Sequence, residues 1–249
     1  NGEARVHKGK GARTYPLVVF SVGMGATVFM LLFLIPRFAA MFSDFGGELP
    51  MPTKIVMGLS DMLKHYGWLF AIIIVTGVIA LKRYRATYKG VRVTDAILLK
   101  VPVIGQVMRK GSVSRFSRTL STLLSSGVPL LDGLKVTARA AGNSIVLDAV
   151  EHIKESVTGG STLAEPMRAT GVFPPMVTQM VSVGEETGRL DEMLSKLADF
   201  YDDEVDAAVD SMTAIIEPVM IVVMGLIVGG MLIAMYLPMF KLISVVSGG

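Results

Sequence analysis

EPVMIVVMGLIVGGMLIAMYLPMF, residues 217–240, is an apolar segment, and YPLVVFSVGMGATVFMLLFLIPRF, residues 15–38, repeats its pattern near the start of the chain. Aligned without a gap, the two segments share two prolines, a glycine and a phenylalanine, which pair as Pro16 with Pro218, Gly23 with Gly225, Pro36 with Pro238 and Phe38 with Phe240. The repetition indicates two copies of one kind of helix.

Both copies are long enough to cross a bilayer. Residues 17–35 contain no charged side chain over 19 positions, and residues 218–237 contain none over 20. An α-helix rises 1.5 Å per residue, so about 20 apolar residues cross the hydrocarbon core. We therefore predict transmembrane helices over 15–38 and 217–238.

A third apolar segment lies between them at residues 66–81, YGWLFAIIIVTGVIAL. Tyr66 and Trp68 suit a membrane interface, and the basic sequence KRYR follows at once. Because 16 residues is short for a span, a buried core helix is the alternative. We predict a transmembrane helix over 66–82, in agreement with a mean hydropathy of +0.57 and a hydrophobic fraction of 51%.

Lysine and arginine are unevenly distributed around these spans. The basic residues before the first span are Arg5, Lys8, Lys10 and Arg13, those after the second are Lys82, Arg83, Arg85, Lys89 and Arg92, and those between the two are Arg37, Lys54 and Lys64. Since cytoplasmic flanks carry the excess of basic residues, we expect a cytoplasmic N-terminus and a periplasmic C-terminal tail. Both copies of the repeat then cross in the same direction, and we expect a further cytoplasmic domain before Asn1.

The expected parts are a cytoplasmic remnant (1–14), the first transmembrane helix (15–38), a short periplasmic loop or amphipathic segment (39–65), the second transmembrane helix (66–82), a cytoplasmic helical bundle (83–216), the third transmembrane helix (217–238) and a periplasmic tail (239–249). Within 83–216, residues that typically begin or end helices recur at intervals that predict several short helices. The expected signals are N-caps at Thr94 and Asn143, a capping box of Thr162 with Glu165, a helix start at Pro174 and Pro175, and a helix end at Gly188. With apolar residues at helical spacing and no strand alternation, the chain reads as an all-α membrane protein.

Two groups of residues in this domain are candidate partner-binding surfaces. One is the end of the helix that begins at Pro175, namely Gly184, Glu185, Glu186, Thr187 and Gly188; the other is an acidic helix with Asp199, Asp202, Asp203, Glu204 and Asp206. Acidic side chains at a helix C-terminus oppose the helix dipole, which suggests a partner or an internal arginine such as Arg118 or Arg168. A solvated acidic face is the alternative, and a divalent-ion site is disfavoured because the acids lack a loop pattern.

Small residues in the spans predict close helix packing. GxxxG-type spacings occur from Ser21 to Gly25 and from Gly225 to Gly229, and loose packing against lipid is the alternative. The candidate packing residues are Pro16, Gly23, Gly25, Pro36, Pro218, Gly225, Gly229 and Pro238. The same spacing leads us to expect a homo-oligomer.

Catalytic chemistry has little support in the sequence. Cysteine is absent, and the histidines His7, His65 and His152 are scattered. There is no GxSxG, HExxH or Walker A pattern. We expect no enzyme activity, no cofactor, no metal site and no nucleic-acid partner.

Three motifs together resemble the platform proteins of type II secretion systems and type IV pilus machines, the F protein or PilC family: FSRTLSTLLSSGVPLLDGL from Phe116, FPPMVTQMVSVGEETGRLDEMLSKLADFYDDEVD from Phe173, and the segment from Glu217. Residues Gly184, Glu185, Thr187 and Gly188 match the family's GExTG signature. The resemblance implies repeated six-helix cytoplasmic domains joined by three transmembrane helices, of which the first domain is missing here.

The resemblance further implies a non-enzymatic scaffold in the bacterial inner membrane. Its expected partners are a cytoplasmic hexameric assembly ATPase, pilin or pseudopilin subunits, other inner-membrane platform proteins and membrane lipid. A subunit of a transporter or channel is the alternative, although the spans lack the ionisable groups that transport normally needs. A membrane-anchored adaptor is a further alternative.

Overall fold

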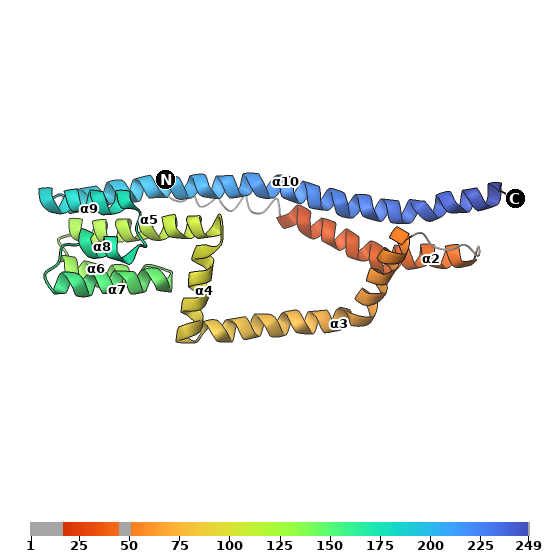
Figure 1. The fold of residues 1–249 in the computed structure, drawn as a ribbon, viewed down its shortest axis with the longest axis horizontal. Helices are drawn as coiled ribbons and strands as arrows, with labels where there is room; N and C mark the ends of the chain where they lie inside the picture. Colours follow the sequence, from red (N-terminus) through yellow and green to blue (C-terminus); the bar gives the residue numbers. More distant parts are fainter. Residues whose placement is uncertain (1–16, 45–50, 249) are drawn as a thin grey trace. The chain divides into compact units, whose positions relative to one another are not determined.

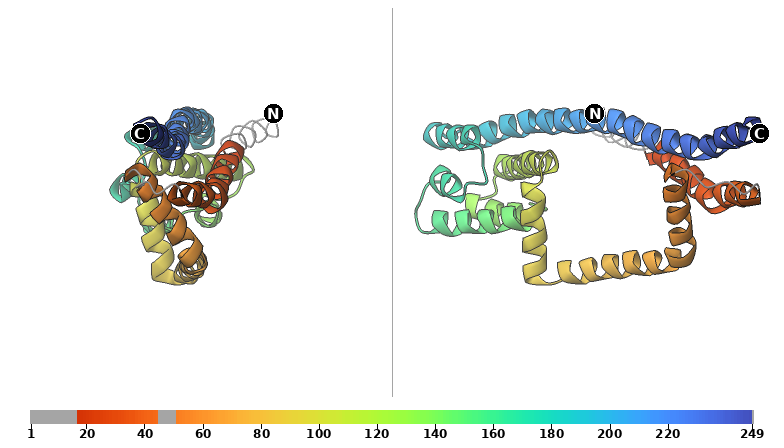
Figure 2. Two further views of the ribbon diagram at one scale, coloured as in Figure 1. Left: turned by 90° about the vertical axis from the view of Figure 1, so that its right-hand side faces the viewer. Right: turned by 45° about the vertical axis from the view of Figure 1, so that its right-hand side comes forward.

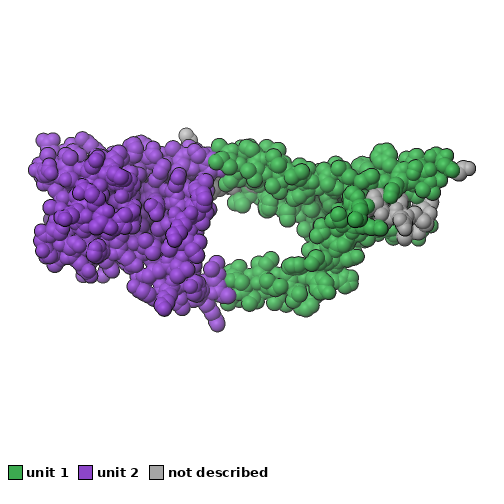
Figure 3. Space-filling view, in the orientation of Figure 1, with its two compact units in different colours: residues 1–79, 213–249 green, residues 80–212 purple. Residues whose placement is uncertain are grey.

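The computed structural model describes residues 17–44 and 51–248, and this part of the chain is helical without a β-strand (Figure 1). The elements are a helix over residues 17–29, the π-helix η1 (Met30–Leu34), α2 (Ile35–Asp44), α3 (Met51–Arg85), α4 (Tyr88–Lys100), α5 (Ile104–Ser125), α6 (Leu130–Arg139), α7 (Ser144–Thr158), α8 (Ala164–Thr170), α9 (Pro175–Thr187) and α10 (Leu190–Ser247). The predicted all-α fold is confirmed. The chain divides into two compact units, coloured in Figure 3: unit 1 takes the residues up to Ile79 and from Thr213 onward, and unit 2 is Ala80–Met212.

Three helices are long and apolar enough to cross a membrane. They are the continuous helical stretch Leu17–Met41, α3 and α10, whose most apolar windows have mean hydropathies of 2.5, 1.6 and 2.5. At most 11% of any window is buried inside the protein. Apolar side chains at this density are unfavourable in water, as is expected of membrane-spanning helices. The prediction of three transmembrane helices is confirmed.

The second helix is longer than the sequence pattern predicted. Much of the segment expected as a loop or amphipathic segment, residues 39–65, is helical, because α2 extends to Asp44 and α3 begins at Met51. Pro52 lies in the first turn of α3, where the missing N–H costs nothing. Thr53 and Ser60 on this added part are buried. Because such polar residues lower the local hydropathy, hydropathy alone does not identify this part of α3 as a continuation of the membrane-spanning helix.

Pro36 follows a widened turn of helix. Proline has no N–H, and its ring clashes with the carbonyl four residues earlier. The preceding residues form η1, in which the Ile35 N–H donates to the Met30 carbonyl five residues back. Pro218 and Pro238 lie instead inside α10, which is one α-helix of 58 residues. The repeated sequence therefore does not produce two identical helices.

Unit 2 is a bundle of α4 to α9 with the end of α3 and the first part of α10, as the right-hand view of Figure 2 shows. Its largest fully buried side chains include Phe116 and Leu120 of α5 and Leu194 and Leu197 of α10. The rings of Phe116 and Phe173 lie 4.8 Å apart. Burial of each such side chain contributes about 1.5–3 kcal/mol. The apolar faces of α5 and α10 thus form part of the core of unit 2.

Most of the local helix signals are confirmed. The Asn143 side chain accepts from the Ile145 N–H, Pro175 is the first residue of α9, and Gly188 ends α9 with φ 71°. Two predictions are wrong. The N-cap of α4 is Thr87, which accepts from the Gly90 N–H, and Thr94 lies inside that helix. The N-cap residue of α8 is Leu163, without a side-chain cap from Thr162 or Glu165.

Candidate functional site: the acidic residues of α9 and α10

The end of α9 packs directly against the start of α10. Gly184 is buried, and a Cβ there would lie 2.9 Å from the Leu190 Cα and 3.3 Å from the Met193 Cβ. Gly188 adopts the left-handed conformation that glycine favours, and the Arg189 N–H donates to the Gly184 carbonyl at 2.9 Å. These two glycines shape the α9–α10 corner.

The Glu185 carboxylate has an internal partner. It accepts hydrogen bonds from the backbone N–H groups of Leu163 and Ala164, the latter at 3.3 Å. These are unpaired donors at the start of α8, where negative charge is favourable. Glu185 therefore supplies the cap that the predicted capping box was expected to supply. The predicted internal arginine is not its partner.

Arg118 of α5 holds two of the acidic residues of α10. Its guanidinium donates to Asp199 at 2.6 Å and to Asp202 at 3.0 Å. The Ser114 hydroxyl also donates to Asp202. The hydrogen bonds with Asp199 and Asp202 stabilise the charged guanidinium and raise the pKa of Arg118.

The same two helices are joined at two further points. Lys110 pairs with Glu204 at 2.9 Å, and the Ser121 hydroxyl donates to the Asp191 carbonyl at 2.8 Å. Lys110, Ser114, Arg118 and Ser121 recur at helical spacing along one face of α5. We call this set of contacts the α5–α10 ladder. The polar stripe on α5 was a signal in the sequence that could have identified the partners of the acidic helix.

The remaining candidates are exposed. Glu186, Asp203 and Asp206 form no ion pair with any described residue. Thr187 is exposed too, with its hydroxyl bonded to the Val183 carbonyl of its own helix at 2.8 Å. Within residues 17–44 and 51–248 no group of three or more acidic or histidine side chains is arranged to hold a metal. The available chemistry is that of exposed carboxylates.

The predicted membrane-packing residues fall into different environments. A Cβ at Gly23 would lie 1.7 Å from the Met224 Cε, so the first helix approaches α10 closely at this glycine. A Cβ added at Gly25, Gly225 or Gly229 would meet nothing within 4 Å. Close packing of another chain's helix against these glycines remains a prediction. Pro16 lies outside the described residues. The packing role of the prolines also remains a prediction.

Two hydroxyls that the sequence analysis overlooked join the helices of unit 1. Thr53 donates to the Ala234 carbonyl of α10 at 2.8 Å, and Ser60 donates to the Leu31 carbonyl of η1. Such bonds fix α3 against both neighbours. They were missed because the first part of α3 was expected only as a short loop or amphipathic segment outside the spans.

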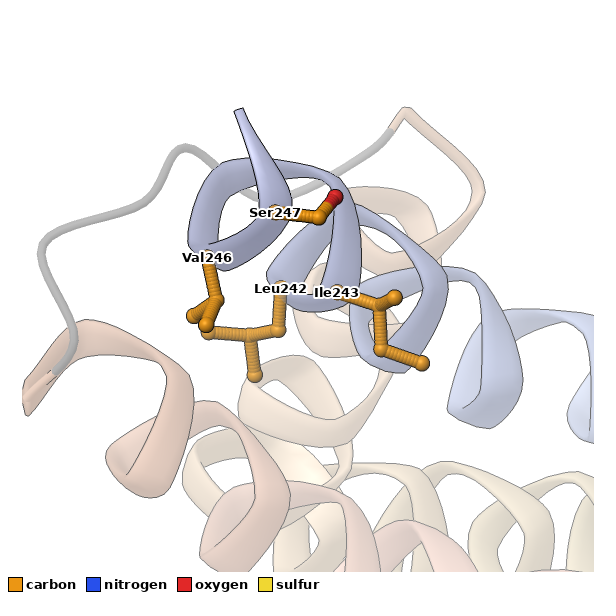
Figure 4. A pocket seen from close by; sticks show the side chains of 4 residues that line it. All are labelled: Leu242, Ile243, Val246 and Ser247. Carbon is orange, nitrogen blue, oxygen red and sulfur yellow. The ribbon is translucent and has the colours of Figure 1, made fainter. Parts of the chain in front are cut away.

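Apolar surface hollows also occur in unit 1. One groove lies where the helical stretch Leu17–Met41, α3 and α10 come together. Its lining residues include Thr27, Leu31, Leu59 and Gly230. A second hollow at the C-terminal end of α10 is lined by Leu242, Ile243, Val246 and Ser247 (Figure 4). Both hollows are walled almost wholly by apolar side chains, which lipid tails or another apolar helix would fill.

These features define a polytopic α-helical membrane protein with a compact helical domain. Residues 116–238 match the family model described as type II secretion system (T2SS), protein F. This match and the relatives described next show that the chain is similar to protein F of type II secretion systems and to the PilC proteins of type IV pili.

Curated relatives cover both the spans and the helical domain. The chain is 48% identical over 240 residues to a type IV pilus assembly protein PilC of Myxococcus xanthus and 45% identical over 239 residues to that of Thermus thermophilus, matching 96% of this chain in each case. It is 32% identical over 236 residues to a type II secretion system protein F of Aeromonas hydrophila, matching 95% of this chain. The chain spans 58%, 59% and 61% of the lengths of these three relatives.

Proposed function

We propose that the protein is a non-enzymatic platform of the inner membrane, which couples a cytoplasmic hexameric assembly ATPase to the assembly of pilin or pseudopilin subunits. The observation that carries the proposal is the 48% identity to a type IV pilus assembly protein over 96% of the chain, which extends through the spans as well as the helical domain. Sequence similarity confined to the spans would support only a shared way of anchoring.

The proposed topology places unit 2 in the cytoplasm. Lys82, Arg83 and Arg85 occupy the last turn of α3, directly after its apolar part. Basic residues beside a span favour the cytoplasmic side. On this basis the N-terminus is cytoplasmic and the C-terminal tail is periplasmic. Other platform proteins or a second copy would contact α10 at Gly225 and Gly229, where an added Cβ would meet nothing within 4 Å. We call these two residues the open glycine face of α10.

For the ATPase contact we propose Glu186, Asp203 and Asp206, together with the neighbouring Thr187. These side chains are exposed, whereas Glu185, Asp199, Asp202 and Glu204 are engaged within unit 2. An exposed carboxylate can pair with a basic surface without first breaking an internal bond. The engaged residues, with Gly184 and Gly188, would then shape the surface rather than provide its charge.

Charge reversal at Glu186 tests this surface. We expect Glu186→Lys in the native protein to abolish piliation or secretion while its amount in the membrane stays unchanged, because the new charge repels a basic partner. The matched control is Glu155→Lys, which makes the same change at another exposed position of unit 2. Full activity of the Glu186 variant would remove this residue from the contact. Normal piliation and secretion after deletion of the gene would contradict the proposed function itself.

A further inference from the structure

Helix α4 leaves the end of α3 through a fixed corner. Only Ala86 and Thr87 separate the two helices (Figure 1). The backbones touch there, since a Cβ on Gly90 would lie 1.7 Å from the Tyr84 carbonyl oxygen. Arg85 in the last turn of α3 pairs with Asp95 of α4 at 3.1 Å. The start of α4 is therefore held close to the point where the chain leaves the apolar part of α3.

The polar side chains on the inner side of α4 have partners within unit 2. Asp95 is buried and also accepts the Ser144 N–H at 2.9 Å. Arg92 binds both carboxylate oxygens of Asp148 at 2.8 Å. Asp95 is the one acidic residue of α4, and its charge is directed into unit 2.

The outer side of α4 is apolar and basic. Ile97 is 57% exposed, and Val93, one turn before it, is exposed as well. Lys89, Val93 and Ile97 recur every fourth residue, so they share one face of the helix. Lys100 is exposed at the end of α4, and the exposed Val103 and Ile104 follow it. We call Lys89, Val93, Ile97 and Lys100 the outer face of α4. It contains no acidic side chain.

We propose that the outer face of α4 lies in the membrane interface and binds anionic phospholipid headgroups. Helices that lie on membranes combine an apolar face with flanking lysines, and basic residues beside a span attract anionic lipid. The bilayer is the partner that chain connectivity places here, because α4 begins seven residues after Leu81, the last apolar residue of the predicted second span. The exposed Tyr84 and Tyr88 suit the same interfacial depth. This inference depends on α3 crossing the membrane and not on the proposed function.

The absence of cysteine from the chain permits a direct test. A nitroxide attached to Ile97→Cys would be placed in the full chain, reconstituted in vesicles of phosphatidylethanolamine, phosphatidylglycerol and cardiolipin. Power-saturation spectroscopy then compares collisions with oxygen, which enters lipid, and with a water-soluble nickel chelate. We expect the label to sit roughly 5–10 Å below the headgroup boundary. A label at Val93→Cys gives a second reading if the first variant does not reconstitute.

The matched control is Val136→Cys on α6, also an apolar residue of unit 2, 47% exposed and next to a lysine. We expect that label to be accessible to nickel. In the Ile97→Cys background, Lys89→Gln with Lys100→Gln, or vesicles without anionic lipid, should reduce the depth. Equal nickel accessibility at 97 and 136 would overturn the inference. Exclusion of both oxygen and the nickel chelate from position 97 would also overturn it, because it indicates a protein neighbour. The same label depth in neutral as in anionic vesicles would overturn it too, because it indicates apolar insertion without headgroup recognition.

Discussion

Arg118 contacts Asp199 and Asp202 across the α5–α10 ladder, but all three side chains are at least 38% exposed. Exposed ion pairs are screened by water and salt, so each contributes only about 0.2–1 kcal/mol. We therefore predict that a double-mutant cycle of Arg118→Gln and Asp199→Asn gives a coupling energy of about 0.2–1 kcal/mol. Thermal unfolding of the full chain in detergent measures it, and the coupling should fall as salt rises. No coupling at low salt would contradict the observed pair.

Glu185 and Glu186 are adjacent in sequence but should behave differently on substitution. Glu185→Gln weakens the cap of α8, and we predict a loss of about 0.5–2 kcal/mol of unfolding free energy, as for other lost caps. Glu186→Gln serves as the control and should change stability by less than about 0.5 kcal/mol, because the side chain is exposed. Both are measured by thermal unfolding of the full chain. Equal effects of the two substitutions would contradict the capping role of Glu185.

Residue roles were predictable from the sequence where the signal is local. Asn143, Pro175 and Gly188 act on backbone groups within a few positions, so their roles follow from residue type. Glu185 acts on Leu163, which lies 22 residues away in the chain. That contact exists only because α8 and α9 pack together. No property of the GEETG segment by itself identifies its partner.

At the level of helices, the corner between α3 and α4 depends on one glycine. Gly90→Ala places a methyl group against the Tyr84 carbonyl, and we predict a loss of about 1–3 kcal/mol, the usual cost of forced overpacking. The rise in hydrogen exchange should be greatest over residues 84–95, measured on the full chain in detergent.

Gly111→Ala in α5 is the matched control for the corner. A Cβ there would meet nothing within 4 Å, so the better helix former should stabilise the chain by up to about 1 kcal/mol. Similar stability of the Gly90 variant and the parent protein would show that the corner is not rigid.

Helix existence was easier to predict than helix extent. The apolar runs predicted all three spans because hydropathy reports length directly. The first half of α3 was expected as a loop or amphipathic segment, because polar residues such as Thr53 and Ser60 lower its hydropathy. In the structure these two hydroxyls contact other helices. The repeat also suggested equivalent glycines, yet Gly23 meets Met224 while Gly225 is open. Equivalence in sequence does not determine which face of a helix finds a neighbour.

For the whole molecule, composition and periodicity were sufficient to predict an all-α membrane protein with one helical domain. The continuity of α10 was only partly predictable, since Pro218 would ordinarily interrupt a helix. In the structure α10 is unbroken and supplies residues to both units. The α5–α10 ladder fixes its first part within unit 2. Helix α10, like α3, therefore connects unit 2 covalently to unit 1.

The measurement that tests the central claim most directly is cross-linking in native membranes, with photoreactive amino acids at positions 186, 203 and 229 of the protein and identification of the products by mass spectrometry. We predict that positions 186 and 203 link to a hexameric assembly ATPase, and that position 229, on the open glycine face of α10, links to pilin-like subunits or to another platform chain. Products that contain only solute-handling membrane proteins would contradict the platform function and favour a transporter subunit.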